Sequence, residues 1–263
     1  SRVSPSTISD LNQKIFERVE EWRNRPLEPK SPYIFVDGIW LKRSWGGEVQ
    51  NVSVLVAIGV STGGFREILG VAEGSREDAE SWRQFLRYLR ERGLEQIDLV
   101  VSDKSLGFLE ALGEFYPEAK WQRCVVHFYR NVLHAVPRGK AKEVALMLKA
   151  VHAQEDKEAA RRKSAEVISK LRAQRLDKAA RIVESGCDET LSYYDFPVAH
   201  WRHIRTNNPL ERLNREIRRR TRVVGSFPDG HAALMLVAAR LRYMAGQKWG
   251  TQRYMNMNQE ISV

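Results

Sequence analysis

The stretch YIFVDGIWLK at residues 33–42 decides the fold, because it sets a single carboxylate inside a run of strand-forming residues. A carboxylate in so apolar a strand costs free energy unless it is paired, protonated or bound to a metal. The alternative is a tight hairpin turn at Asp37-Gly38, which would leave two very short strands. The pattern favours one continuous strand with Asp37 at its centre.

Two more strand-like runs follow this stretch, and glycine pairs separate the three. They predict a three-stranded antiparallel meander. A helix to about residue 92, a short buried strand, a second helix and a last strand come next. The expected ranges after the first strand are 51–60, 66–72, 97–101 for the buried strand, 106–115 for the second helix and 121–128 for the last strand. This order predicts an α/β fold with a mixed five-stranded sheet flanked by helices.

The remaining segments are predicted to be helical. Residues 129–197 lack strand alternation and are rich in Ala, Lys, Arg and Glu, which indicates an all-helical insertion. Asn208-Pro209 then provides a good helix start. The expected helices are one before residue 26, three in the insertion at 140–153, 157–174 and 176–184, and two after it at 208–222 and 230–245.

The composition points to an anionic partner. The formal net charge is +10 and the sequence pI is about 9.7, so nucleic acid is the first candidate. A hydrophobic content of 43% excludes global disorder, and two cysteines exclude a disulfide-rich scaffold and a four-cysteine zinc module. The longest nearly apolar stretch, 52–60, is too short to span a bilayer, and no secretory leader is visible. We therefore expect a cytoplasmic protein without a membrane partner.

The positive charge is concentrated between residues 201 and 222, where eight arginines face two glutamates. Arginine forks bind phosphate oxygens bidentately, so this segment is a candidate DNA-binding surface. The alternative is a solvated helix face, but the imbalance of charge favours phosphate contact. The arginines are Arg202, Arg205, Arg212, Arg215, Arg218, Arg219, Arg220 and Arg222.

Two further acidic residues lie at positions where a binding or catalytic site is expected. Asp103 ends the buried strand, at the edge of the sheet where α/β proteins bind ligands; the alternative is an N-cap for the next helix. Glu211 lies near the start of a late helix, where a capping box is the alternative. Leu210, Leu213 and Ile217 form the predicted buried stripe of that helix, with Glu211, Asn214 and Arg218 on its flank.

Together the three acids have the chemistry of a site for two divalent cations that clamp a phosphodiester. One cation would activate a water or a 3′-hydroxyl, and the other would stabilise the leaving oxygen. Hard oxygen ligands favour Mg²⁺ or Mn²⁺ over zinc.

Several strings of the chain resemble the Mutator-type bacterial insertion-sequence transposases, which are DDE transposases with an RNase H-like catalytic domain. The resemblance covers nearly the whole chain. The strings are DG at 37–38, VSD at 101–103, WQRCVVHF at 121–128, WRHIRTNNPLE at 201–211 and RRRTR at 218–222.

This resemblance implies a catalytic and metal-binding triad of Asp37, Asp103 and Glu211. It also implies cleavage at element ends followed by strand transfer to target DNA, by a homodimer on double-stranded DNA associated with the nucleoid. The implied segments are 1–32 as the end of an amino-terminal DNA-binding region and linker, 33–128 and 198–263 as the catalytic core, and 129–197 as the insertion. The alternatives are an RNase H-like nuclease without strand transfer and a non-catalytic DNA-binding relic.

Three more residues match family motifs. Cys124 and His127 form the family's Cys-x-x-His pair, but too few further ligands accompany them for zinc. On the predicted strand they would point to opposite faces. We expect a buried Cys124, and His127 as a neighbour of the active site. Trp201 would either anchor the insertion on the core or stack on a DNA base.

Overall fold

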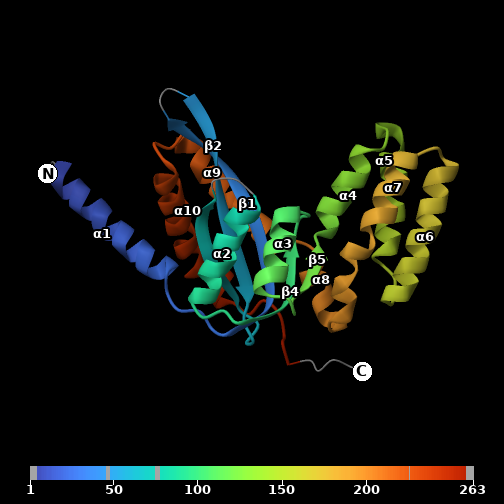
Figure 1. Ribbon diagram of the computed structural model, residues 1–263, viewed down its shortest axis with the longest axis horizontal. Helices are drawn as coiled ribbons and strands as arrows, with labels where there is room; N and C mark the ends of the chain where they lie inside the picture. Colours follow the sequence, from blue (N-terminus) through green and yellow to red (C-terminus); the bar gives the residue numbers. More distant parts are fainter. Residues whose placement is uncertain (1–4, 46–47, 75–77, 225, 259–263) are drawn as a thin grey trace. The chain divides into compact units, whose positions relative to one another are not determined.

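The computed structural model describes residues 5–45, 48–74, 78–224 and 226–258 (Figure 1). Its five strands follow the order β3-β2-β1-β4-β5. The chain divides into two compact units, which we call unit 1 (1–98, 105–119 and 208–257) and unit 2 (99–104, 120–207 and 258–263). The predicted α/β class with a mixed five-stranded sheet is confirmed.

Unit 1 is built on an antiparallel meander of β1 (Lys30–Trp45), β2 (Glu48–Val60) and β3 (Arg66–Gly74). Asp37 pairs in register with Val56, and β1 continues without a break through Gly38. The hairpin-turn alternative is therefore wrong. The continuous strand forms because apolar residues on both of its sides are covered, as the buried Phe35 and Val36 show.

Helices cover both faces of this meander (Figure 1). Gly70 of β3 lies against Phe85 of α2, and the side chain of Glu73 on the opposite face lies against Gly230 of α10. The helices of unit 1 are α1 (Pro5–Arg23), α2 (Ala79–Glu91), α3 (Leu106–Phe115), α9 (Asn208–Val224), α10 (Gly230–Ala245) and α11 (Lys248–Thr251). Helix α3 packs on α2, whereas α9 and α10 both contact β1.

Unit 2 combines a short parallel strand pair with helices. The last residues of β4 (Gln96–Ser102) pair with β5 (Lys120–Arg123), with Val101 opposite Gln122. The chain then forms α4 (Val125–His134), α5 (Arg138–Val151), α6 (Lys157–Ala173) and α7 (Asp177–Gly186), which confirms the three predicted helices after residue 138. The short helices η1 (Asp188–Thr190), η2 (Ser192–Asp195), η3 (Val198–His200) and α8 (Trp201–Ile204) follow.

The expected strand over 121–128 is wrong in its second half. Strand β5 ends at Arg123, and Phe128 donates its amide hydrogen to the carbonyl of Cys124 in the first turn of α4. Val125, Phe128 and Val132 are all buried, with helical spacing. The helical packing of this stripe outweighs the preference of two adjacent valines for a strand.

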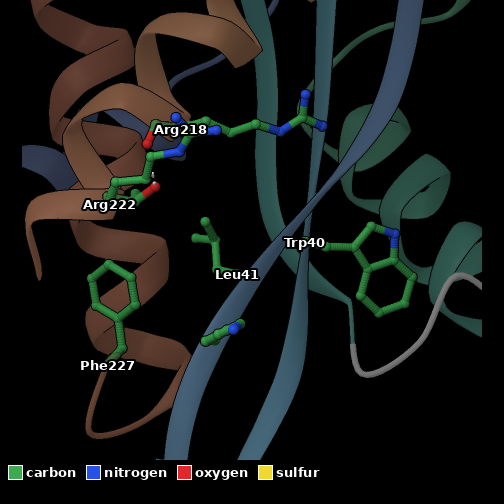
Figure 2. A pocket seen from close by; sticks show the side chains of 7 residues that line it. Trp40, Leu41, Arg218, Arg222 and Phe227 are labelled. Atoms are coloured by element: carbon green, nitrogen blue, oxygen red, sulfur yellow. Dashed lines mark hydrogen bonds between the residues drawn. The ribbon is translucent and has the colours of Figure 1, made fainter. Parts of the chain in front are cut away.

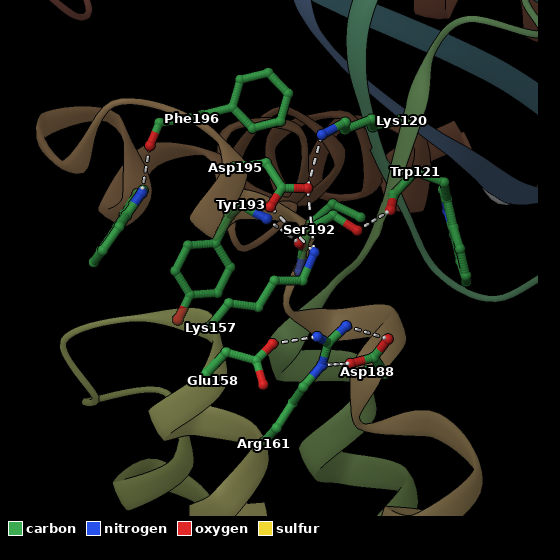
Figure 3. A network of polar contacts seen from close by, with 12 residues as sticks. Lys120, Trp121, Lys157, Glu158, Arg161, Asp188, Ser192, Tyr193, Asp195 and Phe196 are labelled. Carbon is green, nitrogen blue, oxygen red and sulfur yellow. Dashed lines mark hydrogen bonds and ion pairs between the residues drawn. The ribbon is translucent and has the colours of Figure 1, made fainter. Parts of the chain in front are cut away.

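A polar network holds the η segments of unit 2 in place (Figure 3). Asp195 accepts hydrogen bonds from Lys120 and Lys157. Partial burial alone would raise the pKa of its carboxyl, but the two lysines together outweigh this and leave the pKa below the ordinary value. Arg161 binds Asp188 with two of its nitrogens. These contacts join β5 to η2, and α6 to η1 and η2.

No helix in the described ranges combines the length and the apolar composition that crossing a bilayer requires.

Candidate functional site

Asp37 is held by two hydrogen bonds at the centre of β1. Its Oδ1 accepts from the backbone amide of Gly38 at 2.9 Å, and its Oδ2 accepts from Nδ2 of Asn214 at 2.7 Å. Asn214 lies on α9 and is 0% exposed, whereas Asp37 is only partly buried. The two contacts fix the orientation of a carboxylate that water can still reach.

Glu211 lies on the same helix, three residues before Asn214. Residues at this spacing are neighbours on a helix surface. Glu211 is partly buried, and its Oε1 atom lies beneath the surface. The predicted buried stripe of Leu210, Leu213 and Ile217 is confirmed.

The expected flank of that stripe needs correction. Asn214 does not lie on the edge of the core but within the buried stripe, because its amide is directed at Asp37. Arg218, one turn further along α9, is exposed. Unit 1 thus brings one proposed acid, Asp37, against the helix that carries a second, Glu211.

Asp103 belongs to unit 2 and follows β4 directly. Its Oδ1 accepts from the amide of Lys104 at 2.7 Å, and its Oδ2 lies 3.8 Å from Nδ1 of His127. Helix α3 has Ser105 as its N-cap, so the N-cap alternative for Asp103 is wrong. Unit 2 therefore brings Asp103 and His127 together.

Cys124 is the N-cap residue of α4 and is fully buried, at 0% exposure, as expected. Its Sγ accepts a hydrogen bond from the amide of Asn207 at 3.2 Å. Because the chain becomes helical at Val125, the expectation that Cys124 and His127 point to opposite faces of a strand is wrong. The thiol has a structural contact in unit 2, joining the start of α4 to the segment before α9.

Trp201 is anchored within unit 2. Its Nε1 donates to the carbonyl of Phe196 at 2.7 Å, and its ring makes edge contacts with Tyr193 and Tyr194 at centroid distances of 5.7 and 4.6 Å. The anchoring role is therefore present in the structure. Stacking on a DNA base stays a prediction.

The arginines of the basic segment fall into distinct groups. Arg219 and Arg220 pair with Glu216, as does Arg240 of α10. The hydrogen bond from Arg219, with help from Arg240, lowers the pKa of Glu216 to about 2. The positive charge of these arginines is thus partly neutralised by Glu216.

Two other arginines make contacts within unit 2. Arg205 is partly buried and donates to the backbone carbonyl of His152, and Arg202 contacts the ring of His203. The remaining four are exposed, and none forms an ion pair with a carboxylate in the described part of the chain. They are Arg212, Arg215, Arg218 and Arg222.

A cavity of about 210 Å³ lies in unit 1 between β1 and α9 (Figure 2). It is lined by Trp40, Leu41, Lys42, Arg218, Thr221, Arg222 and Phe227. No role was predicted from the sequence for Trp40 or Lys42, although both lie within five residues of Asp37 in the same strand.

The donor chemistry of the three acids suits a hard cation, because carboxylate oxygens are preferred by Mg²⁺ and Mn²⁺. Asp37 and Glu211 belong to unit 1, and Asp103 belongs to unit 2. Within the ranges that the structure describes, no three His, Cys, Asp or Glu side chains form a group that could hold a metal ion. The metal site stays a prediction.

Comparison with known proteins gives a family match over residues 1–250, to the model described as "Transposase, Mutator family". The transposase for insertion sequence element ISRM5 of Rhizobium meliloti is 37% identical over 97% of this chain and 64% of its own length. The transposase for element IS1081 of Mycobacterium tuberculosis is 37% identical over 98% of this chain and 62% of its own. The transposase for element IS256 in transposon Tn4001 of Staphylococcus aureus is 32% identical over 97% of this chain and 66% of its own length. The chain thus spans slightly less than two thirds of the length of these relatives.

Proposed function

The chain belongs to the Mutator family of transposases, and from this premise we propose that it cuts DNA strands at the ends of a mobile element and joins the freed ends to target DNA. The three relatives named above are transposases for insertion sequences, and their names support transposition as the process. The strand order and the acid in the first strand support an RNase H-like core of the DDE type.

We further propose that Asp37, Asp103 and Glu211 hold two Mg²⁺ or Mn²⁺ ions. When bound, such ions would activate the attacking water or 3′-hydroxyl and stabilise the leaving oxygen. The observation that carries the proposal is the carboxylate of Asp37, set in an apolar strand and oriented by the buried amide of Asn214 at 2.7 Å. The hydrogen bonds from Gly38 and Asn214 orient the carboxylate, and because Asp37 is only partly buried, a ligand can still reach it.

The other residues of the chain have supporting tasks in this proposal. Asn214 keeps Asp37 in one orientation, which limits the loss of side-chain freedom when a ligand binds. His127 lies beside Asp103 and can donate a hydrogen bond to it or to a phosphate oxygen. The exposed arginines of α9 contact the DNA backbone. The substrate is double-stranded DNA, both element ends and target, bound by a homodimer.

The test is cleavage and strand transfer of a labelled DNA that carries the end of the element encoding the chain. We expect Mg²⁺-dependent nicking followed by joining to a second DNA. Asp37→Asn and Asp103→Asn should abolish both reactions while DNA binding persists, because an amide cannot neutralise the charge of a cation. Near-normal cleavage by either variant would remove that acid from the proposed triad.

Strand transfer separates this proposal from a simple nuclease. A chain that cuts at the element end but never joins the 3′-hydroxyl to target DNA, under conditions where cutting is complete, would be a nuclease of the same fold. A chain that binds DNA and cuts nothing in Mg²⁺ or Mn²⁺ would contradict the proposal of an enzyme.

A further inference from the structure

The cavity between β1 and α9 is built on the same two elements that hold Asp37 (Figure 2). Leu41 follows Asp37 by four residues, which places it about 13 Å along the strand. Arg218 follows Asn214 by four residues, about 6 Å along the helix. Phosphates of one strand of a duplex follow each other at about 3.4 Å along the axis. The cavity therefore lies within a few nucleotides of the proposed acid in the same unit.

Three cations line this cavity, and their charge is not neutralised within the protein. Lys42, Arg218 and Arg222 form no ion pair with a carboxylate among the residues that the structure describes. Arg219 and Arg220, by contrast, pair with Glu216 on the same helix. Helix α9 thus carries two arginines that pair with a carboxylate and, separately, two arginines that line the cavity. The arginines at the cavity are suited to bind phosphate, because the guanidinium forks match the geometry of phosphate oxygens.

Apolar and aromatic groups complete the cavity. Leu41 and Phe227 are buried, at 5% and 4% exposure, whereas the large indole of Trp40 is 48% exposed. Figure 2 shows Trp40 and Leu41 on opposite sides of β1, with Arg218 extended from α9 towards the strand. At about 210 Å³ the cavity is smaller than the ~300–1,000 Å³ of pockets for drug-sized ligands. This volume suits the phosphate groups of a DNA strand that passes along the cavity better than a drug-sized ligand enclosed in it.

An exposed aromatic ring beside unpaired cations is the combination with which proteins bind single-stranded nucleic acid. Bases of an intact duplex have both faces stacked, so a tryptophan platform requires an unpaired base. We propose that this cavity binds the backbone of a single-stranded DNA segment, with Lys42, Arg218 and Arg222 on the phosphates and Trp40 stacked on a neighbouring base. The inference rests on the proposed function, to which it adds a site for the strand near the point of cleavage.

The test is equilibrium binding of a fluorescent oligothymidine to the whole chain, in EDTA and at several salt concentrations. Replacing both Arg218 and Arg222 by Ala should reduce the slope of log K against log salt by about 1.4, since each phosphate contact on a single strand contributes about 0.7. The matched control replaces Arg219 and Arg220 by Ala, which removes the same charge from the arginines that pair with Glu216. This control should change the slope by less than half as much.

A second pair of variants tests the indole. Trp40→Leu should weaken oligothymidine binding about 5- to 150-fold, the equivalent of the ~1–3 kcal/mol of one stacked base. Trp40→Phe keeps an aromatic face and should recover most of this loss. Because Trp40 is half exposed, neither variant should disturb folding, and thermal melting checks this.

Three results would overturn the inference. The first is an equal loss of salt slope in the Arg218/Arg222 variant and the Arg219/Arg220 variant, and the second is oligothymidine binding by Trp40→Leu with the affinity of the natural chain. The third is a loss of affinity in the cavity variants that is as large for duplex DNA as for single-stranded DNA. The two proposals fail separately, because binding is measured without divalent cations. Cavity-dependent binding by a chain that cuts nothing in Mg²⁺ overturns only the proposed function. Normal cleavage with cavity-independent binding overturns only this inference.

Discussion

The stability of unit 2 should fall steeply in mild acid because of His152. This side chain is 6% exposed, with Nε2 2.7 Å from Oγ1 of Thr190 and Nδ1 2.8 Å from the hydroxyl of Tyr129. Burial lowers the pKa of His152 from 6.5 to about 4; the carbonyl of Leu148 raises it and the charge of Arg205 lowers it further. The imidazole is therefore neutral in the folded protein at neutral pH.

The sign of the effect follows from the order in which the two states take up a proton. The folded-state pKa lies below the ordinary value, so the unfolded chain is protonated first as the pH falls. The stability that neutral His152 contributes is complete above pH 6.5, is lost progressively between pH 6.5 and about pH 4, and is absent below. A pKa change of this size corresponds to about 3 kcal/mol of unfolding free energy.

The assay is urea unfolding of the chain and of a His152→Gln variant at pH 7 and pH 4. The variant cannot titrate at this position, so the stability advantage of the natural chain over it should shrink by about 3 kcal/mol between the two pH values. An NMR titration of the His152 ring gives an independent value for the pKa. An advantage that stays constant with pH, or a ring that titrates near 6.5 in the folded protein, would refute the reasoning.

Two further predictions concern contacts within unit 2. Cys124→Ala removes the acceptor of the Asn207 amide and should lower the unfolding free energy by about 1–3 kcal/mol. Cys124→Ser keeps an acceptor and should lower it less. Equal urea midpoints for the two variants would contradict this. Glu189→Gln leaves the guanidinium of Arg123, which is 6% exposed, without its carboxylate and should cost about 3 kcal/mol. Lys104→Ala removes the more exposed partner of the same glutamate and should cost less than about 1 kcal/mol; a loss as large as that of Glu189→Gln would show that the burial of Arg123 does not decide the effect.

The sequence predicted the strands of unit 1 well because burial on both faces leaves a simple pattern. The runs around Asp37 are apolar at successive positions, and a turn there would have left too few residues for pairing. The segment 121–128 was harder, because two adjacent valines favour a strand by local preference. Val125, Phe128 and Val132 carried the opposing helical signal, which becomes decisive only when neighbouring helices cover that stripe.

The residues of the candidate site could be proposed from the sequence, but the contacts that they make could not. The sequence pattern placed Asn214 on the flank of the buried stripe of its helix. In the structure Asn214 is buried because its amide contacts Asp37, which lies 177 positions away. Which arginines of the basic segment have a carboxylate partner also depends on distant residues, since Arg240 of α10 shares Glu216 with Arg219. Local pattern gives the charge of a helix but does not show which charges another element neutralises.

The most direct test of the central claim is Glu211→Gln, assayed by thermal melting beside cleavage of a labelled element end in Mg²⁺. Gln keeps the size and hydrogen-bonding capacity of the side chain, so the cap of the helix should persist, and losing a charge in its first turn costs only about 0.3–1 kcal/mol. The account predicts a folded protein that binds DNA and cuts no strand, because the negative charge that a cation needs is gone. A folded variant that cuts at the normal rate would contradict it and would make Glu211 a helix cap.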